Sequence, residues 1–588
     1  MWDAQAEQKR VVPGPALGRI SRYRVPGHPA PIDLDLRGNE GPAPEPELLR
    51  ALNGPEGTEL LRRYPSAVSL ERRLAEGWGL SPEQVAVTAG ADDGLDRICR
   101  AMMGPGRRMI CPTPGFVMTP RAARLAGGEV VELPWREALP VEAILQAAED
   151  EQVCVLVLTS PNNPTGAVIT EAQLRRLAAE LPARVLIVLD VAYGEFADIE
   201  LRPVALSLPR VLVVGTFSKA WGLAGLRVGH VAGPAEYVGW VKDVGLPYAV
   251  SGPALALAEA ALDRGDEPVR AHAAAVKIAR GRIEAAFESV GAAVTRGEGN
   301  FVFARTPKAA WIADAMAGLG IGVRAFPGRS GLEDALRIAC PTEAGDIDRV
   351  CDGIRTAVRP EAILFDLDGV LADVSASYRV AIVETAAHFG VHVTAADVAE
   401  VKAAGDANND WKVTQRLLQR AGVQVDLDAI IEVFEGLYQG TPQAPGLRRH
   451  EALTVSRTAL AGLAERVPLA VVTGRPRDDA RAFLEGMEIA QYFQAVVCME
   501  DGPAKPDPAP VRVALEALGV RRAWMLGDTP DDVRAARGAG VVPVGVVAPG
   551  EGDPEGARQA LLGSGAARVI DEAAAVVDTL SRWLEETP

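Results

Sequence analysis

The chain has 588 residues, a formal net charge of −17 and 48% hydrophobic residues. A chain of this length is expected to fold into about four structural domains. Its excess of acidic residues argues against a surface that binds nucleic acid or anionic membranes. The start, MWDAQAEQKR, has no signal-peptide pattern and no apolar run is long enough to span a membrane, so we expect a cytoplasmic enzyme. Six cysteines without CxxC spacing indicate buried or reduced thiols.

The first informative segment runs from Gln84 to Met102. Val85 and Val87 alternate as in a strand, Gly90-Ala91-Asp92 form a turn, and apolar residues then recur at helical spacing. A helix that begins at this turn presents free N–H groups and the positive end of its dipole, which suits a phosphate. An ordinary strand-to-helix turn would have the same pattern.

Two more apolar runs end in polar residues. VCVLVLT predicts a buried parallel strand, and the rigid loop from Ser160 to Gly166 that follows it contains Asn163. A second strand is predicted from Val185 to Leu189 and leads into Asp190, with Tyr193 close behind. A carboxylate at the mouth of a parallel sheet can cap a helix or bind a ligand.

Residues 211–229 place Lys219 in a Ser-Lys-Ala turn after an apolar strand. A lysine that forms a Schiff base must be neutral part of the time, and burial beside a cation lowers its pKa. Thr216, Ser218 and Arg227 carry donors for a phosphate dianion. The segment is typical of a pyridoxal phosphate site, although a basic turn after a buried strand would have the same residues.

The four segments together predict a pyridoxal phosphate pocket. Asp190 would pair with the pyridine nitrogen and keep it protonated, so that the ring can act as an electron sink. Asn163 and Tyr193 would donate hydrogen bonds to the phenolate oxygen. The helix that starts at Gly90 would bind the phosphate.

These segments resemble fold-type I aminotransferases of the histidinol-phosphate aminotransferase family, over roughly residues 10–358. The resemblance implies a large mixed-sheet domain over about residues 45–255, with a small α/β domain formed by the remaining ends of 1–358. Further matching residues are Tyr23 with Pro26-Gly27, Asn39-Glu40, Arg63-Tyr64-Pro65, Pro247-Tyr248, Asn300-Phe301, Arg324 and Arg337.

The resemblance also implies roles for residues around the cofactor. Lys219 forms the Schiff base and moves a proton between the substrate's α-carbon and the cofactor's C4′. Phe116 stacks on the cofactor ring. Tyr64 matches a residue that reaches the cofactor phosphate across a dimer interface, which implies a homodimer.

Tyr23, Arg324 and Arg337 match positions that hold the anionic end of the substrate. A planar guanidinium can bind either a phosphate or the carboxylate of glutamate, and both substrates use one pocket in turn. Three positions depart from the family pattern, with Val191 where glutamate is usual, Ala249 where asparagine is usual, and Gly41 directly after Asn39-Glu40. Enzymes that decarboxylate threonine phosphate or transaminate aromatic amino acids share much of this pattern and remain alternatives.

A second domain begins near Pro360. The helical stretch AGDIDRVCDGIRTAV ends near Val358, and Arg359-Pro360 breaks it before the apolar strand AILF. The junction has no Gly/Ser tract and no charge run, so we expect residues 1–358 and 361–588 to be held close together.

Four motifs follow in order in this second half. Asp366 and Asp368 lie two residues apart after an apolar strand, and two such carboxylates repel unless a cation such as Mg²⁺ joins them. The motifs resemble those of haloacid dehalogenase-like phosphohydrolases, which implies a Rossmann-like α/β domain. The later motifs are Val471-Val472-Thr473-Gly474, Lys505-Pro506-Asp507 and Met525 to Asp532.

This second resemblance assigns roles that the chemistry supports. Asp366 attacks phosphorus, while Asp368 protonates the leaving alkoxide and then activates water. Thr473 and Lys505 hold the phosphoryl oxygens.

The resemblance also predicts the Mg²⁺ ligands. Asp528 joins Asp366 and the main-chain carbonyl of Asp368 around the ion, and Asp532 lies just outside this set.

The stretch between Asp366 and Thr473 is far longer than a loop. Helical patterns such as WKVTQRLLQRAG predict an inserted helical cap over about residues 376–455. Caps exclude water and select the substrate, and SYRVAIVETAAHFG is predicted to face it. The polar cluster Asn408-Asn409-Asp410 is interpreted as a helix cap rather than a substrate contact.

We therefore interpret the chain as a bifunctional enzyme. The first half would move an amino group from glutamate to imidazole acetol phosphate, leaving 2-oxoglutarate and histidinol phosphate. The second half would hydrolyse a phosphate monoester, with histidinol phosphate as the candidate because consecutive steps would then lie on one chain. The alternatives are a pyridoxal-dependent decarboxylase of a phosphorylated amino acid, a phosphatase resembling capped phosphoglycolate phosphatases, or a non-catalytic C-terminal module.

Overall fold

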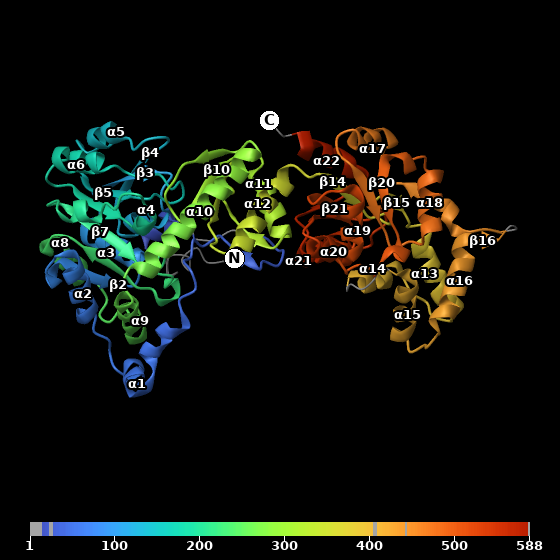
Figure 1. The fold of residues 1–588 in the computed structure, drawn as a ribbon, viewed down its shortest axis with the longest axis horizontal. Coiled ribbons are helices and arrows are strands. Elements are labelled where there is room, and N and C mark those ends of the chain that lie inside the picture. Colours follow the sequence, from blue (N-terminus) through green and yellow to red (C-terminus); the bar gives the residue numbers. More distant parts are fainter. Residues whose placement is uncertain (1–13, 21, 23–26, 404–408, 442–443, 586–588) are drawn as a thin grey trace, which may run out of the picture.

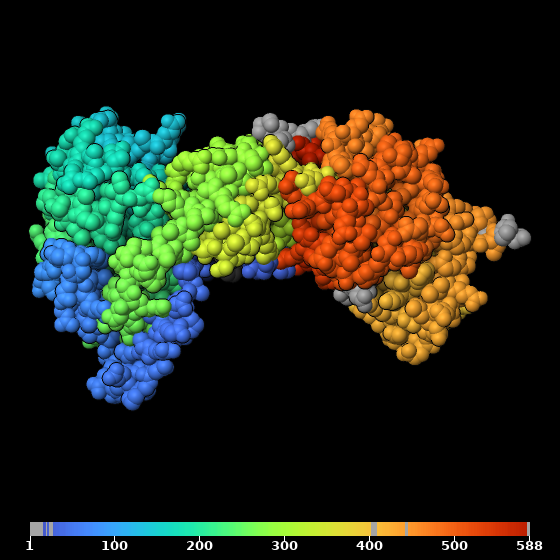
Figure 2. Space-filling view, viewed as in Figure 1, coloured from blue at the N-terminus to red at the C-terminus, as the bar shows by residue number. Residues whose placement is uncertain are grey.

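The computed structural model consists of two α/β units arranged along one long axis (Figure 1). It describes residues 14–20, 22, 27–403, 409–441 and 444–585. The N-terminal unit has a large sheet at one end of the molecule and a small sheet near its middle, and the second unit occupies the other end (Figure 2). Among the described helices, none combines the length and the apolar character needed to cross a membrane.

The largest sheet has seven strands in the order β2-β8-β7-β6-β5-β3-β4, with β8 antiparallel to its neighbours β2 and β7. Its central strands are buried along their whole length, because helices cover both faces. The strands are β2 (Val85–Thr88), β3 (Arg108–Thr113), β4 (Glu129–Pro134), β5 (Val153–Thr159), β6 (Leu186–Asp190), β7 (Val211–Thr216) and β8 (Gly229–Ala232). Strand β5 coincides with VCVLVLT, and β6 begins one residue later than predicted.

Apolar side chains from the helices form a separate core on each face of this sheet. The helix predicted after Gly90 is present as α3 and begins at Ala91. Helix α1 projects from the lower end of this unit, and α9 lies at the same end (Figure 1). The helices of this region are α1 (Gly54–Arg62), α2 (Val68–Trp78), α3 (Ala91–Met102), α4 (Met118–Leu125), α5 (Val141–Ala147), α6 (Glu171–Glu180), α7 (Arg202–Leu206), α8 (Ala235–Asp243) and α9 (Gly252–Asp263).

The small sheet is antiparallel, in the order β12-β13-β10-β9. The N-terminal strand β1 (Leu34–Asp35) pairs in parallel with β11 (Ile321–Gly322), so this region combines both ends of the first unit. Its other elements are α10 (Glu267–Ser289), β9 (Ala293–Thr295), β10 (Phe301–Arg305), α11 (Ala309–Gly318), β12 (Arg324–Ala325), β13 (Ala335–Ala339) and α12 (Ala344–Val358).

The second unit contains six parallel strands in the order β20-β19-β14-β21-β22-β23. The first strand, β14, lies between β19 and β21, and ligand sites of such sheets lie at the carboxyl ends of the strands beside this change of direction. The strands are β14 (Ala362–Phe365), β19 (Leu469–Val472), β20 (Phe493–Val497), β21 (Ala523–Gly527), β22 (Val542–Val546) and β23 (Arg568–Ile570). The helices are α17 (Arg457–Ala464), α18 (Arg477–Gly486), α19 (Ala509–Leu518), α20 (Pro530–Gly538), α21 (Pro554–Ser564) and α22 (Val576–Glu585).

A helical segment is inserted after β14. Its two linkers lie side by side, because β15 (Ala372–Asp373) on the way in pairs with β18 (Ala452–Leu453) on the way out. The segment contains α13 (Tyr378–His388), α14 (Ala395–Ala403), α15 (Asp410–Arg420), α16 (Leu427–Gln439), β16 (Gly440–Thr441) and β17 (Ala444–Pro445). Asn409 caps α15 by accepting the Lys412 N–H at 3.0 Å, which confirms the predicted cap, while Asn408 lies outside the described residues.

The two units share one hydrophobic cluster. Trp311 of α11 packs against Trp524 of β21 and Trp583 of α22, with ring centroids 5.1 and 4.5 Å apart. The Trp524 indole also donates to the main-chain oxygen of Thr356, at 2.7 Å. A buried contact therefore joins the units, as expected from a junction without a flexible tract. All six cysteines are buried and unpaired, also as expected.

Replacing Trp524 with alanine should destabilise the whole chain. The side chain is fully buried between the units, and removing a buried tryptophan costs about 3–5 kcal/mol. Denaturant unfolding followed by circular dichroism should show this loss. Trp240→Ala is the matched control, since that side chain is 39% exposed and should cost at most about 1 kcal/mol. Equal losses in the two variants would contradict a joint core.

Candidate active sites

The polar residues predicted in the first unit meet in one cavity of about 550 Å³. It lies where β5, β6 and β7 end and faces the small sheet, which contributes Arg324 and Arg337. The predicted residues that line it are Ala91, Asp92, Phe116, Asn163, Asp190, Tyr193, Thr216, Ser218, Lys219, Arg227, Arg324 and Arg337.

Asp190 is the most buried acidic group of this cavity, at 3% exposure. Burial raises the pKa of its carboxyl group to about 7, because an ionised carboxylate is poorly solvated there. Its Oδ1 accepts an N–H from Ala192 at 2.9 Å. A cationic group bound in the cavity would stabilise the ionised form.

Donor groups converge at the end of the cavity where α3 begins. The hydroxyl oxygens of Thr216 and Ser218 lie 2.9 Å apart, and Arg227 Nη1 donates to Ser218 Oγ at 3.3 Å. Arg227 Nη2 lies 3.5 Å from Asp92, in the first turn of α3. Gly90 has a φ of +83°, and a Cβ there would lie 2.6 Å from Arg227 Nη2. Hydroxyl, guanidinium and free helix N–H groups together suit a phosphate.

Lys219 lies beside Tyr193 in the same cavity. Its Nζ donates to the main-chain oxygen of Gly38 at 3.2 Å and lies 5.8 Å from the centre of the tyrosine ring. The Tyr193 hydroxyl accepts hydrogen bonds from the amides of Asn163, at 3.3 Å, and Asn39, at 3.2 Å. An amine, a phenol and two amides are therefore grouped around one space.

Four arginines besides Arg227 line the cavity. Arg337 donates to Asn163 Oδ1 at 2.7 Å, so the predicted substrate arginine and the predicted cofactor amide are in direct contact. Arg329, which donates to the oxygen of Gly115 at 3.0 Å, was missed by the sequence interpretation because it belongs to no motif. The four are Arg37, Arg324, Arg329 and Arg337.

Among the described residues, Gly90 and Tyr64 were predicted to bind the cofactor but are not part of the cavity lining. Tyr64 is 82% exposed and stacks on Tyr248 with ring centroids 4.6 Å apart, so its role across a dimer interface stays a prediction. Tyr23 lies outside the described residues.

The motifs of the second unit also meet, at the carboxyl ends of β14, β19 and β21. Asp366 follows β14, and burial raises the pKa of its carboxyl group to about 7. Lys505 Nζ donates to Asp366 Oδ1 at 2.8 Å and to the oxygen of Val472 at 3.1 Å, and lies 2.5 Å from Asp532 Oδ1. The nucleophile expected from the sequence is thus in contact with the lysine expected to hold the phosphoryl group.

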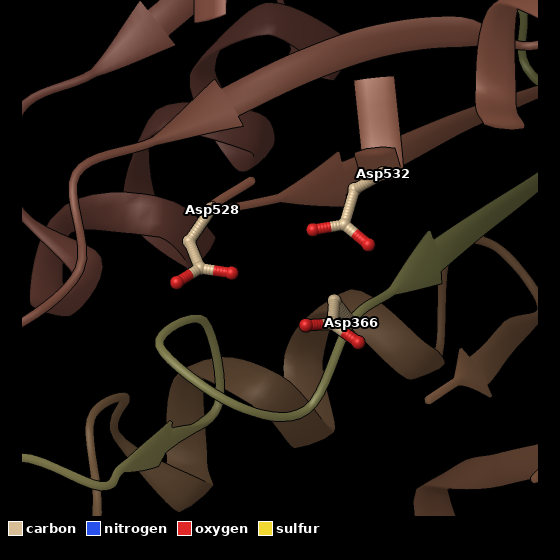
Figure 3. A group of neighbouring side chains, drawn as sticks. All are labelled: Asp366, Asp528 and Asp532. Carbon is tan, nitrogen blue, oxygen red and sulfur yellow. The ribbon is translucent and has the colours of Figure 1, made fainter. Parts of the chain in front are cut away.

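Asp366, Asp528 and Asp532 point their carboxylates toward a common space (Figure 3). One oxygen of each lies within 4.8 Å of the others, an arrangement that could hold a metal ion. Asp532, which the sequence interpretation placed just outside the ligand set, is therefore as much part of this group as Asp528. It also caps α20, since its Oδ2 accepts the N–H of Thr529 at 3.0 Å. Carboxylate oxygens are the ligands that Mg²⁺ prefers.

The carboxylate of Asp368 does not belong to this cluster of three aspartates and contacts Arg475 instead. Its Oδ1 accepts hydrogen bonds from Arg475 at 2.5 and 2.7 Å, which leaves the main-chain carbonyl as the atom expected at the metal. Thr473 Oγ1 accepts the main-chain N–H of Arg475 at 3.1 Å. Arg475 follows Thr473-Gly474 directly, and this adjacency was the one sequence signal that could have identified it.

Comparisons with known proteins divide the chain in the same way. Residues 45–354 match the family described as aminotransferase class I and II, and residues 363–546 match haloacid dehalogenase-like hydrolases. The chain is similar to the histidinol-phosphate aminotransferase of Haloferax volcanii, with 34% identity over 323 residues that cover 53% of this chain and 87% of that protein.

A solved structure of the histidinol-phosphate aminotransferase from Sinorhizobium meliloti, in complex with pyridoxal-5′-phosphate, has a TM-score of 0.52. The identity is 25%, and the match covers 61% of this chain and 98% of the other. Together with the family matches, this likeness confirms the predicted fold class, a fold-type I aminotransferase followed by a haloacid dehalogenase-like domain.

An imidazoleglycerol-phosphate dehydratase from Phytophthora nicotianae is 47% identical over 197 residues, which is 32% of this chain. The chain spans only 44% of the length of that relative.

Replacing Gly369 with alanine should disable the second site. Its φ is +76°, and a Cβ there would lie 2.3 Å from Asp528 Oδ2, so the carboxylate must move. A displacement of this size can lower a rate by about 100-fold. Mg²⁺-dependent release of 4-nitrophenol from 4-nitrophenyl phosphate measures the effect.

Gly390→Ala is the matched control for this prediction. Gly390 has a φ of +82° and nothing within 4 Å of the added Cβ, so it carries the same backbone strain without the collision. Equal rates in the two variants would contradict the proposed contact with Asp528.

Proposed function

Since this chain belongs to the class I and II aminotransferase family and also carries a haloacid dehalogenase-like hydrolase domain, we propose that it makes histidinol phosphate and then hydrolyses it to histidinol. The first step would transfer an amino group from glutamate to imidazole acetol phosphate. The observation that supports it most is the single cavity in which Lys219, Asp190 and the candidate substrate arginines, Arg324 and Arg337, meet.

The residues of this cavity fit pyridoxal phosphate. The buried Asp190, with its raised pKa, needs a cationic partner such as a protonated pyridine nitrogen. Thr216, Ser218 and Arg227 would hold the phosphate beside the start of α3. When bound, the cofactor supplies the electron sink for the reaction.

Within this site, Lys219 Nζ would move a proton between the substrate's α-carbon and the cofactor's C4′. Arg337 and Arg324 would bind the carboxylate of glutamate and the phosphate of the keto substrate in turn, since a guanidinium accepts either anion. Arg329, which lines the same cavity, adds positive charge for this end of the substrate.

The second site fits Mg²⁺ because Asp366, Asp528 and Asp532 present hard oxygen ligands to one space. When bound, the ion neutralises charge on the phosphoryl group. Asp366 would form a bond to phosphorus as the ester P–O bond breaks, with Lys505 and Thr473 holding the phosphoryl oxygens. Asp368 would give a proton to the leaving alkoxide and then take one from the water that releases phosphate.

One consequence of the proposed first step and one observation favour histidinol phosphate as the ester that is hydrolysed. It is the product of the proposed first step, so both reactions would lie on one chain. The names of two relatives, histidinol-phosphate aminotransferase and imidazoleglycerol-phosphate dehydratase, both refer to phosphate esters with an imidazole ring.

We expect the active enzyme to be a homodimer. The part of the chain around α1 projects from the body of the molecule (Figure 2), and large apolar side chains of this region are exposed. A second copy of the chain would cover them and would bring Tyr64 to the partner's cofactor phosphate. The exposed side chains include Leu49, Leu61, Tyr64, Val68, Leu246 and Tyr248.

Single substitutions should separate the two activities. Lys219→Ala should abolish transamination between histidinol phosphate and 2-oxoglutarate, because Lys219 is the one lysine among the described residues that line the cavity, and should leave ester hydrolysis unchanged. Asp366→Asn should abolish hydrolysis and leave transamination unchanged. Glutamate and phosphate are measured separately in the same preparations. Loss of both activities from either change would contradict two independent sites.

Leu61→Asp should dissociate the dimer. Leu61 is 77% exposed in a single chain, so the folded monomer should tolerate a carboxylate there, whereas a buried apolar interface should not. Sedimentation velocity should show a monomer, with transamination lost and ester hydrolysis retained. The matched control is Ile199→Asp, at 70% exposure on another part of the unit, which should stay dimeric. If the Leu61→Asp variant remains a dimer, the interface lies elsewhere.

A further inference from the structure

Arg475 is a buried cation to which neither proposed mechanism gives a role. Its side chain is 1% exposed, although it lies only two residues after Thr473, at the end of β19. A charged group is buried this completely only where other groups satisfy it. The groups that do so here come from the catalytic loop and from both ends of the inserted helical segment.

On the catalytic side, Arg475 binds Asp368. Nε and Nη2 both donate to Oδ1, at 2.7 and 2.5 Å. Because both bonds go to Oδ1, the guanidinium holds this oxygen in place, while Oδ2 stays available for a proton. Asp368 is the group that the proposed function uses as acid and base.

On the other side, Arg475 binds Glu451, which immediately precedes the returning linker strand β18. Nη1 donates to Glu451 Oε2 at 3.0 Å, and Nη2 donates to Oε1 at 3.2 Å. Glu451 Oε1 also accepts the hydroxyls of Ser377, just before α13, and of Tyr438, near the end of α16, each at 3.0 Å. One carboxylate thus ties together the two ends of the inserted segment and the guanidinium.

Aromatic rings enclose the guanidinium and exclude water from it. The ring of Tyr378 lies 4.9 Å from the Arg475 carbon Cζ, and that of Phe483 lies 5.2 Å away. Tyr378 begins α13 of the inserted segment, whereas Phe483 belongs to α18 of the core. Tyr378 also stacks on Tyr438, with centroids 4.3 Å apart. The enclosure is therefore complete only when the inserted segment is seated on the core.

We propose that Arg475 is a positioning residue that fixes the direction of Asp368 only while the inserted helical segment is seated, so that proton transfer waits for the site to close. The proposal rests on the proposed role of Asp368. Movement of the linkers would withdraw Glu451 and Tyr378 from the guanidinium. Arg475 would then be hydrated and free to turn, and Asp368 would lose its fixed orientation.

Esters with different leaving groups show separately which proton transfers depend on the orientation of Asp368. When Asp366 bonds to phosphorus and an alkyl P–O bond breaks, the alkoxide needs the proton of Asp368. Nitrophenolate is a good leaving group and departs without it. In the second step, water attacks phosphorus, its proton goes to Asp368, and phosphate leaves with Asp366 restored, so both kinds of ester need Asp368 at this stage.

The test compares the full chain with an Arg475→Met/Glu451→Gln double variant, which removes the cation without leaving an unpaired buried carboxylate at position 451. With 4-nitrophenyl phosphate and Mg²⁺, rapid mixing should show a burst of about one nitrophenol per site, followed by turnover slowed by about 100-fold. With glycerol 2-phosphate, an alkyl ester, the burst of alcohol should also be lost. Transamination by the same preparation checks that the chain is folded.

Arg481→Met is the matched control, since that side chain is 72% exposed on α18 and should leave both esters unaffected. Equal loss on both esters without a burst, or no loss at all, would overturn the positioning role. If the double variant does not fold, Glu451→Gln alone decides: it keeps Arg475 and should lower alkyl ester turnover more than the nitrophenol burst. A wild-type chain that hydrolyses neither ester would instead contradict the proposed function of the second site.

Discussion

Buried carboxylates at the ends of parallel strands are the constraint on which both sites depend. Asp190 is the last residue of the central strand β6 of one sheet, and Asp366 directly follows the central strand β14 of the other. Burial raises the pKa of each to about 7, so each needs positive charge to remain ionised. Lys505 is already in contact with Asp366, whereas the cavity around Asp190 leaves this role to a bound cation. The rest of each site can be understood as groups placed around that charge.

The contact between the two units does more than keep two activities on one chain, because it joins the units into one folded structure. Trp311, Trp524 and Trp583 form a core that neither unit completes alone. The small sheet that contributes Arg324 and Arg337 to the first cavity belongs to the same part of the molecule as this contact. The hydrolase domain therefore packs against the part of the aminotransferase that carries its candidate substrate arginines.

Much of this architecture could be predicted because each motif follows an apolar strand within a few residues. That local rule located Lys219, Asp190 and Asp366 and the helix after Gly90, all of which the structure places at strand ends. It could not identify Arg329 or Glu451, because their positions depend on how distant segments fold together. Arg475 was adjacent to a motif, but its role follows from two partners that lie 107 and 24 residues earlier in the chain, Asp368 and Glu451.

The most direct test of two consecutive reactions uses the forward direction. Purified chain is given imidazole acetol phosphate, glutamate, pyridoxal phosphate and Mg²⁺, and 2-oxoglutarate, histidinol phosphate, histidinol and inorganic phosphate are followed over time. We expect histidinol, inorganic phosphate and 2-oxoglutarate to accumulate in equal amounts. If histidinol phosphate accumulates without phosphate release, the hydrolase acts on a different ester. If no 2-oxoglutarate forms, the assignment of the first site is contradicted.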